Sequence, residues 1–312
     1  MQIVILGAGY AGLRAAIDLD RLLRARGRAD KVILVDQHPY HQLVQLLHQA
    51  ATAAIPSEQA FYELAPLLSR SGVRFIEGRV ASIAPLEREV RLADGRALRY
   101  DRLAIPLGAE TAYHGVPGAR EHTMPLRTLE HATRLRDHLV RSFEAAARTS
   151  DPVERRILMT TAIVGGGFTG CQLAGELAAG AGQLCAKTGA PRGEVRIALL
   201  ERDPELLRQF GPWATREAEQ VLGRMGVSVY LNTAVEAVEP RALRLAGGRV
   251  LRAATLVWAG GVKGPDLLRE AGLPTDAAGR VLVDRYLRVR DQALIFAAGD
   301  CAAVPAGPRE GT

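Results

Sequence analysis

The chain has 312 residues, of which 48% are hydrophobic and 24% are charged, a composition typical of a folded globular protein. This length favours two domains over a single core, and no apolar run is long enough to span a bilayer. The formal net charge of +6 comes mostly from arginine, but no basic run with interleaved aromatic residues indicates nucleic-acid binding. We therefore expect a two-domain protein without a nucleic-acid partner.

The first residues of the chain and its cysteines indicate the compartment. The N-terminus reads directly as a strand, so we expect no secretory signal. Cys171, Cys185 and Cys301 are widely spaced and form no C-x-x-C pair. This spacing favours a reducing, cytoplasmic environment and argues against a zinc cluster or a C-x-x-C redox disulfide.

The stretch MQIVILGAGYAG opens the chain with a dinucleotide-binding pattern. Ile3–Leu6 reads as a central parallel strand, and Gly7, Gly9 and Gly12 follow at G-x-G-x-x-G spacing. In this pattern Gly7 permits a tight turn, Gly9 lets the backbone approach a pyrophosphate, and Gly12 lets the next helix pack closely.

The residues after the glycines supply the context that this motif requires. A helix from Leu13 to about Leu23 directs its N-terminal amides at the phosphates, and Val32–Val35 reads as the next parallel strand. That strand ends at Asp36, which is placed to accept hydrogen bonds from a ribose diol.

Three histidines, His38, His41 and His48, follow within a short span. Their spacing matches no zinc motif, and no cysteine or clustered carboxylate joins them, so packing or surface roles are expected. Beyond them we expect a short helix at Glu63–Leu68 and then a small antiparallel meander laid on the parallel sheet. The meander comprises Val73–Ile76, Arg79–Ile83, Glu89–Leu92 and the return from Leu98 to Ile105.

The middle of the chain contains an amphipathic helix and a polar stretch. Leu129, Ala132, Leu135, Leu139 and Phe143 recur at helical spacing and predict a helix over residues 128–147. The polar residues 148–156 read as a linker.

The opening pattern then repeats, with a strand, three glycines, a helix, a second strand and a terminal acid. The strand is Thr161–Val164, the glycines are Gly165, Gly167 and Gly170, the helix is Cys171–Ala179, and Val195–Leu200 ends at Glu201. Two such folds in one chain are far more specific than one, and they predict two bound nucleotides. The remaining expected elements are a helix at 215–225, strands at 227–231, 255–258, 281–283 and 293–298, and an antiparallel excursion over 235–251.

With these motifs in view, the sequence resembles the two-dinucleotide flavoproteins, and among them the type II NADH dehydrogenases, which are non-pumping respiratory NADH:quinone oxidoreductases. The resemblance rests on GAGYAG at 7–12, GGGFTG at 165–170 and FAAGDCA at 296–302. It rests also on VDQHPYHQLVQLLHQAAT at 35–52, RTLEHATRLRDHL at 127–139 and LAGEL at 173–177. It implies an α/β protein with two three-layer Rossmann-like domains, in which an NAD domain is inserted into a discontinuous FAD domain. The implied ranges are 1–126 and 277–312 for FAD, 127–156 for a helix and linker, and 157–276 for NAD(H).

The resemblance also implies the ligands and their residues. FAD, held without a covalent bond, would contact Gly7, Gly9, Tyr10, Ala11, Gly12, Asp36, Val80, Gly108, Gly299 and Asp300. NADH would contact Gly165, Gly167, Thr169, Gly170, Glu201 and Gly260. The implied chemistry is hydride transfer from NADH to the flavin and electron transfer to a quinone, and a homodimer stays open.

Several positions depart from the family pattern. Pro106–Gly108 replaces Ala-Thr-Gly, and Gln45–His48 replaces Pro-Leu-Leu-Tyr. Phe168 and Gln172 stand where the family has Pro and Glu. We expect Gln172 near the nicotinamide end, where Glu176, one turn later on the same face, could partly substitute.

Relatives continue with a segment that covers the flavin, completes a quinone site and supplies a peripheral membrane helix, whereas this sequence stops at Thr312. We expect flavin reduction to survive in part without that segment and membrane quinone reduction to be inefficient. Two alternatives stay open. One is another flavoprotein reductase, of the sulfide:quinone or ferredoxin type, for which Cys171 and Cys301 would have to flank the flavin. The other is a non-catalytic nucleotide-binding or redox-sensing fragment.

Overall fold

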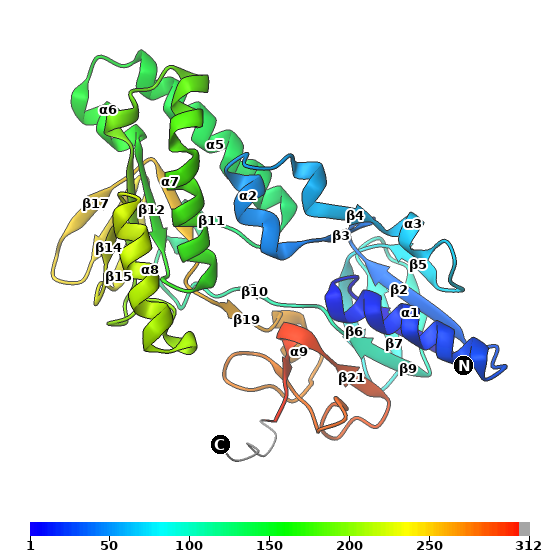
Figure 1. Cartoon of the computed structure of the whole chain (residues 1–312). Helices are drawn as coiled ribbons and strands as arrows, with labels where there is room; N and C mark the ends of the chain where they lie inside the picture. Colours follow the sequence, from blue (N-terminus) through cyan, green and yellow to red (C-terminus); the bar gives the residue numbers. More distant parts are fainter. Residues whose placement is uncertain (306–312) are drawn as a thin grey trace. The chain divides into compact units, whose positions relative to one another are not determined.

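Residues 1–305 are described by the computed structural model of the chain, and they cluster into two units (Figure 1). Unit 1 comprises Met1–Gln42, Phe61–Glu110 and the chain from Val262 onward, and unit 2 comprises Leu43–Ala60 and Thr111–Gly261. These divisions do not coincide with the expected ranges. Residues 43–60 and 111–126 cluster with unit 2, and residues 262–276 cluster with unit 1.

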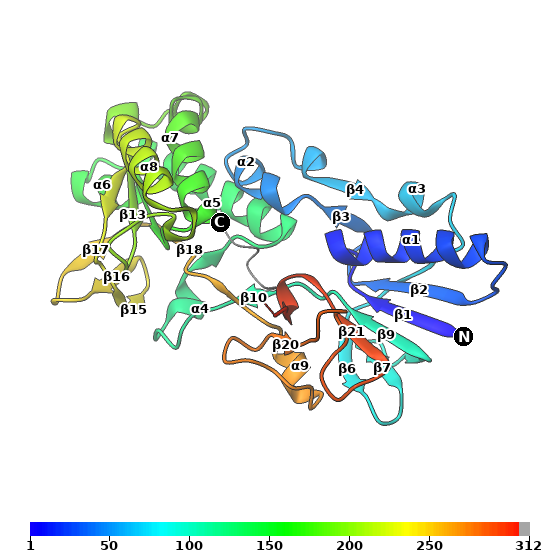
Figure 2. The ribbon, with the colours of Figure 1, turned by 60° about the horizontal axis from the view of Figure 1, so that its bottom comes forward.

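Unit 1 is built on a five-stranded parallel sheet with the order β21-β9-β1-β2-β5. Both faces of the sheet are buried, as the apolar strands predict. Ile3, Ile5 and Leu34 pack beneath helix α1 on one face. Val4 and Leu6 belong to the core on the other face, where the antiparallel sheet β6-β7-β8 lies. Unit 1 therefore has three layers, which Figure 2 shows from a second direction.

The bounds in unit 1 are as follows. They are β1 (Gln2–Leu6), α1 (Tyr10–Ala25), β2 (Lys31–Asp36), β3 (Tyr40–Gln42), β4 (Phe61–Glu63), α3 (Leu64–Leu68), β5 (Arg74–Glu77), β6 (Val80–Ala84), β7 (Glu89–Leu92), β8 (Ala97–Arg99), β9 (Arg102–Ile105), α9 (Asp266–Glu270), β20 (Val281–Leu282), β21 (Ile295–Ala297) and β22 (Ala302–Ala303). The expected meander is correct only for β6, β7 and β8. Strands β5 and β9 instead join the parallel sheet, because their buried residues face the same core as β1 and β2.

Unit 2 repeats this plan. Its parallel sheet has the order β11-β18-β12-β13-β14, and the antiparallel sheet β15-β16-β17 comes between β14 and β18 in sequence, as β6-β7-β8 comes between β5 and β9 in unit 1. Ile163 and Leu199 pack toward helices α5 and α7, whereas Ala162 and Leu200 belong to the core on the meander side. Each unit is therefore a Rossmann-like three-layer fold.

The bounds in unit 2 are α2 (Leu47–Ala51), α4 (Ala119–His122), β11 (Met124–Pro125), α5 (Leu129–Arg148), α6 (Pro152–Leu158), β12 (Thr160–Val164), α7 (Phe168–Thr188), β13 (Arg196–Leu200), α8 (Pro212–Arg224), β14 (Ser228–Tyr230), β15 (Val235–Glu239), β16 (Ala242–Leu245), β17 (Val250–Arg252) and β18 (Thr255–Trp258). Short strands β10 (Glu110–Thr111) and β19 (Val262–Lys263) pair where the chain passes between the units.

The expected linker at 148–156 is wrong in part, since it contains the start of α6. Asp151 caps this helix by accepting a hydrogen bond from the Val153 amide, and Pro152 occupies the first turn, where its missing N–H costs nothing. Helix α7 also runs further than its expected end at Ala179, and it stops at Gly189 in the left-handed conformation. In the described part of the chain, no helix is both long and apolar enough to cross a membrane.

Candidate dinucleotide sites

The first glycine turn lies between β1 and α1, and two of its glycines are required by backbone contacts. Gly7 has φ +108°, and a Cβ there would lie 2.6 Å from the Pro106 carbonyl oxygen. A Cβ on Gly12 would lie 1.8 Å from the Gly7 carbonyl oxygen. The Gly7 amide donates to the Val35 carbonyl at 2.7 Å, so the turn is fastened to β2. These contacts match the turn and packing roles expected for Gly7 and Gly12.

Gly9 differs, because nothing within the protein lies within 4 Å of a Cβ placed there. Its φ of −69° is also open to other residues, so neither packing nor conformation of the chain accounts for a glycine. No side chain caps α1, and its first turn carries no acidic residue. An open glycine beside uncapped helix amides fits a pyrophosphate that approaches the backbone closely.

Asp36 ends β2 and braces the same turn. One carboxylate oxygen accepts a hydrogen bond from the Ala8 amide at 2.6 Å, and the other accepts one from the His38 amide at 2.9 Å. The Gly78 amide donates to the Asp36 carbonyl, which brings the chain just before Val80 to the end of β2. A carboxylate oxygen has more than one acceptor site, so Asp36 can brace the turn and still receive a ribose hydroxyl.

Gly299 and Asp300 lie beside the start of α1. A Cβ on Gly299 would be 3.8 Å from the Ala11 Cβ, and Gly299 has φ +78°. Both residues are exposed. Gly108, with φ +71°, ends the Pro106–Gly108 segment that packs on the glycine turn. The fold thus gathers Gly7, Gly12, Gly108 and Asp300 at one edge of unit 1, which is where open α/β sheets bind ligands.

His41, in strand β3, contacts the glycine turn in a way that sequence reasoning missed. It is buried, its Nδ1 lies 2.8 Å from the Ala8 carbonyl oxygen, and its ring makes an edge contact with Tyr10 at 4.7 Å. His38 stacks on Tyr40. Among residues 1–305, no His, Cys, Asp and Glu cluster could hold a metal. The packing of His38 on Tyr40 agrees with the expected packing or surface roles, whereas the contact of His41 with the glycine turn is an addition that the sequence did not indicate.

The second glycine turn, between β12 and α7, repeats the first in detail. Gly165 has φ +114°, and its amide donates to the Leu200 carbonyl at 2.8 Å. A Cβ on Gly170 would lie 1.9 Å from the Gly165 carbonyl oxygen, whereas nothing lies within 4 Å of one on Gly167. Thr169 is exposed in the first turn of α7, which no side chain caps. The same open glycine therefore faces a second uncapped helix.

Glu201 takes the place of Asp36 in unit 2. One carboxylate oxygen accepts from the Gly166 amide, and the other accepts from the Asp203 amide at 2.9 Å. The side chains of Arg202 and Arg208 approach Asp203 at 3.8 and 3.7 Å, and both are largely exposed. An acid and two exposed cations thus lie at this edge of the site.

The other expected NAD residues lie at two further places in unit 2. Gly260 follows β18, and its carbonyl oxygen lies 2.8 Å from His114 Nε2, a contact that the sequence did not indicate. Gln172 and Glu176 lie on α7 and are both partly exposed. Glu176 faces His48 of α2: burial lowers the pKa of His48, and the Glu176 charge opposes that shift.

The cysteines lack the electrostatics of reactive thiols. Burial, followed by the charge of Glu201, raises the pKa of Cys171 to about 12, although the residue lies in the first turn of α7, and helix N-termini lower the pKa of reactive cysteines. Burial also raises the pKa of Cys301, whose thiol donates to the Ile105 carbonyl at 2.9 Å. All three cysteines are free.

Comparison with known proteins agrees with this geometry. The family model for pyridine nucleotide-disulphide oxidoreductases matches residues 1–311. Proteins named type II NADH:quinone oxidoreductase from Staphylococcus saprophyticus and Staphylococcus aureus are each 28% identical, over 98% of this chain and 76% of their own length.

Solved structures show the same fold. A Plasmodium falciparum NDH2 structure in complex with NADH aligns with a TM-score of 0.88 at 19% identity, over 97% of this chain and 64% of that one. An Aquifex aeolicus sulfide:quinone oxidoreductase aligns at 0.77 and 22% identity, over 97% and 69%. The chain therefore spans just under two thirds of the first of these structures. These findings confirm the expected fold class and resemblance, and they agree with an oxidoreductase that uses FAD and NADH. The chain belongs to the pyridine nucleotide-disulphide oxidoreductase family.

Proposed function

We propose that this protein is an FAD-dependent oxidoreductase that takes hydride from NADH and passes the electrons to a quinone-type acceptor. The observation that carries the proposal is the repeated turn, in which Gly9 and Gly167 are open while the flanking glycines are enclosed by backbone. One such turn fits a single dinucleotide, and two in one chain fit a donor and a resident cofactor.

Unit 1 would hold FAD. The amides at Gly9, Tyr10 and Ala11 would bind the pyrophosphate, and Asp36 would bind the adenosine ribose. Backbone at Val80 would lie beside the adenine, with Gly108, Gly299 and Asp300 at the flavin end of the site. When bound, FAD supplies the acceptor for the hydride, so the chain itself supplies binding and orientation.

Unit 2 would hold NADH. The amides at Gly167 and Thr169 would bind its pyrophosphate, Glu201 its ribose, and Gly260 a more distant part of the molecule. Gln172 and Glu176 would lie toward the nicotinamide end, because they follow the phosphate-binding turn along α7. No acid or base is needed for hydride transfer, so these side chains would position the donor.

The relatives' names support quinone as the acceptor, and we extend the proposal to peripheral association with the cytoplasmic face of a membrane. The proposal is tested with purified protein. It should be yellow, release FAD on acid precipitation, and lose its flavin absorbance when NADH is added without oxygen. Colourless protein that cannot be reconstituted with FAD would refute it, and a flavin that NADH does not bleach would leave only nucleotide binding.

A further inference from the structure

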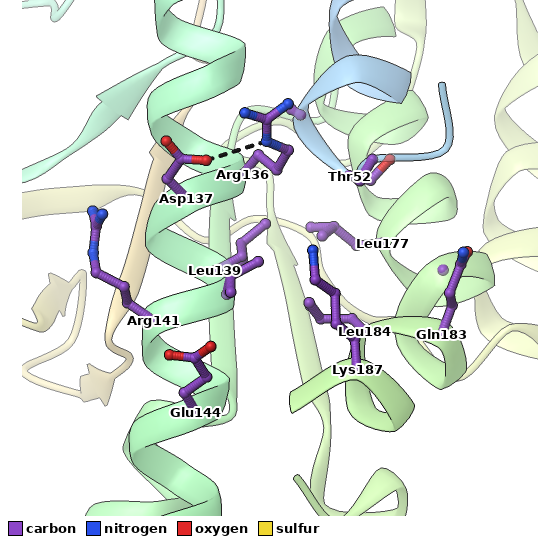
Figure 3. Close-up of a pocket in the computed structure, with 14 residues that line it drawn as sticks. Thr52, Arg136, Asp137, Leu139, Arg141, Glu144, Leu177, Gln183, Leu184 and Lys187 are labelled. Carbon is purple, nitrogen blue, oxygen red and sulfur yellow. Dashed lines mark hydrogen bonds and ion pairs between the residues drawn. The ribbon is translucent and has the colours of Figure 1, made fainter. Parts of the chain in front are cut away.

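A pocket of about 670 Å³ lies among α2, α5 and α7, entirely within unit 2 (Figure 3). Its residues come from the end of α2, the middle of α5 and the second half of α7, beginning at Leu177. The glycine turn and Gln172 do not line it, so it is separate from the candidate NADH site. Its volume is in the range of small-molecule sites, which is about 300 to 1,000 Å³.

The apolar part of the lining is aliphatic. Leu139 and Leu177 are buried at its base, and Val140, Leu184 and Ala51 complete the apolar surface. No aromatic side chain lines the pocket. A flat ring such as adenine or flavin would therefore find no stacking partner, whereas a flexible alkyl chain would be covered by groups of its own kind.

Gly180 lines the pocket from α7 and leaves one wall open. Nothing lies within 4 Å of a Cβ built there, although the residue is in the interior of a helix. Glycine is unfavourable in a helix interior by about 1 kcal/mol relative to alanine. The missing side chain therefore enlarges the pocket without being required by neighbouring atoms.

The charged residues around the pocket determine which charge on a ligand would find a partner there. The Arg136 guanidinium donates a hydrogen bond to the Ser57 hydroxyl and forms an ion pair with Asp137. Glu144 forms an ion pair with Arg148 at 3.8 Å. Figure 3 shows Arg141 on the far side of α5, whereas the Lys187 amine extends between α5 and α7 toward the leucines. Lys187 is exposed, and among the described residues its amine forms no ion pair. Of the cations that line the pocket, Lys187 is thus the one that extends toward its apolar residues.

We propose that this pocket binds an aliphatic carboxylate, with the alkyl chain on Leu139, Leu177 and Leu184 and the carboxylate on Lys187. Such an anionic amphiphile would place its alkyl chain on the aliphatic surface and keep its carboxylate beside the solvent-exposed lysine. The proposal does not depend on NADH oxidation.

Calorimetric titration of the full chain with dodecanoate, below its micelle concentration, tests the proposal, with dodecyltrimethylammonium as the matched cation. Dodecanoate should bind more tightly than the cation. Lys187→Gln should weaken dodecanoate binding about fivefold, the effect of one solvent-exposed ion pair, and Lys187→Glu should reverse the preference between the two probes. Lys31→Gln, a change at an exposed lysine on β2, is the control and should have no effect.

Gly180→Leu should fill the pocket and abolish binding of both probes while keeping the thermal unfolding temperature. If this variant unfolds, the two Lys187 variants still decide, because an exposed side chain does not support the fold. Wild-type protein that binds no dodecanoate, equal affinity for the two probes, or affinity unchanged by Lys187→Gln would each overturn the proposal. If a second copy of the chain, or another segment of it, occupied the pocket, dodecanoate would not bind.

Discussion

Glu201 uses both carboxylate oxygens within unit 2, one toward Gly166 and one toward Asp203, and its charge is therefore fixed in place. A 2′-phosphate on the bound ribose would be close to this charge. Like charges about 5 Å apart repel by about 3 kcal/mol at an effective dielectric constant near 20, and less in a wet site. We therefore predict that NADH is preferred over NADPH by about one to two orders of magnitude in kcat/KM.

The matched variant is Glu201→Gln, which keeps an acceptor for one amide and removes the charge. Selectivity should fall toward parity in this variant, as measured by kcat/KM for both cofactors. Arg202 and Arg208 are the opposing factor, because either cation could turn from Asp203 to a phosphate. Equal kcat/KM values for NADH and NADPH in the wild type, or an unchanged ratio of these values in Glu201→Gln, would show that Glu201 does not face the ribose.

Cys171 lies at the start of α7, yet burial and Glu201 raise the pKa of its thiol to about 12. The thiolate is the nucleophile, so at neutral pH alkylation of Cys171 should be about 10³-fold slower than that of a free cysteine. Iodoacetamide labelling followed by mass spectrometry measures the rate, and unfolded protein provides the control. Rapid labelling of Cys171 in the folded protein would contradict this prediction.

At the scale of elements, each glycine turn contains one glycine that the fold does not need. We predict that Gly9→Ala folds normally but loses FAD, because its Cβ meets no protein atom and would occupy the place of the pyrophosphate. Gly12→Ala should instead destabilise the protein by about 3 kcal/mol or more, since its Cβ would overlap the Gly7 carbonyl. Urea unfolding and flavin content distinguish the two. An unfolded Gly9→Ala, or one that retains FAD with normal affinity, would count against the site.

Gly167→Ala makes the same test in unit 2. The variant should keep its bound FAD and its stability, whereas its affinity for NADH should fall by at least tenfold, an effect of about 1.4 kcal/mol. NADH titration by fluorescence measures the affinity, and flavin content serves as the internal control. Loss of FAD from this variant would mean that the two turns are not assigned to separate ligands.

How far the sequence predicts the structure depends on whether a signal is local. Strand, glycine turn, helix and terminal acid are set by neighbouring residues, so both Rossmann-like cores were predictable down to Asp36 and Glu201. The contact of His41 with the Ala8 carbonyl is not local, because it depends on where hairpin β3–β4 places the ring. The placement of Leu43–Ala60 is not local either. Its apolar residues pack on α5 and α7, so this segment belongs to unit 2 although the residues before it in sequence belong to unit 1.

At the scale of the whole molecule, we expect three histidines to make the folding stability of unit 2 sensitive to acid. Burial lowers the pKa of His48, His131 and His138, all of which lie in unit 2. Glu176 opposes this shift at His48 and Glu130 opposes it at His131, while Arg134 adds to it at His131 and His138. Each histidine binds its proton more readily when unfolded, so the stability they contribute is present above the unfolded pKa and is lost as the pH falls below it.

We predict that the urea concentration at the unfolding midpoint decreases as the pH is lowered from about 7.5 to about 5.5. This window lies above the titration of ordinary carboxylates. His138→Gln should reduce this fall, because glutamine can still donate to the Ala254 carbonyl but cannot take up a proton. His122→Gln, at an exposed histidine at the end of α4, is the matched control. A midpoint that does not change over this window, or a fall that is the same in all three proteins, would contradict the prediction.

The last prediction concerns the two units acting in sequence on one pair of electrons. If unit 1 holds FAD and unit 2 holds NADH, one equivalent of NADH should reduce one flavin per chain, and one equivalent of a soluble quinone should reoxidise it, since each transfers two electrons. Anaerobic stopped-flow mixing measures both steps. Gly167→Ala should slow reduction by NADH but leave reoxidation of chemically reduced flavin unchanged, because the acceptor does not use the second glycine turn. Flavin that NADH reduces but no quinone reoxidises would retain the NADH assignment and move the acceptor to another chemical class.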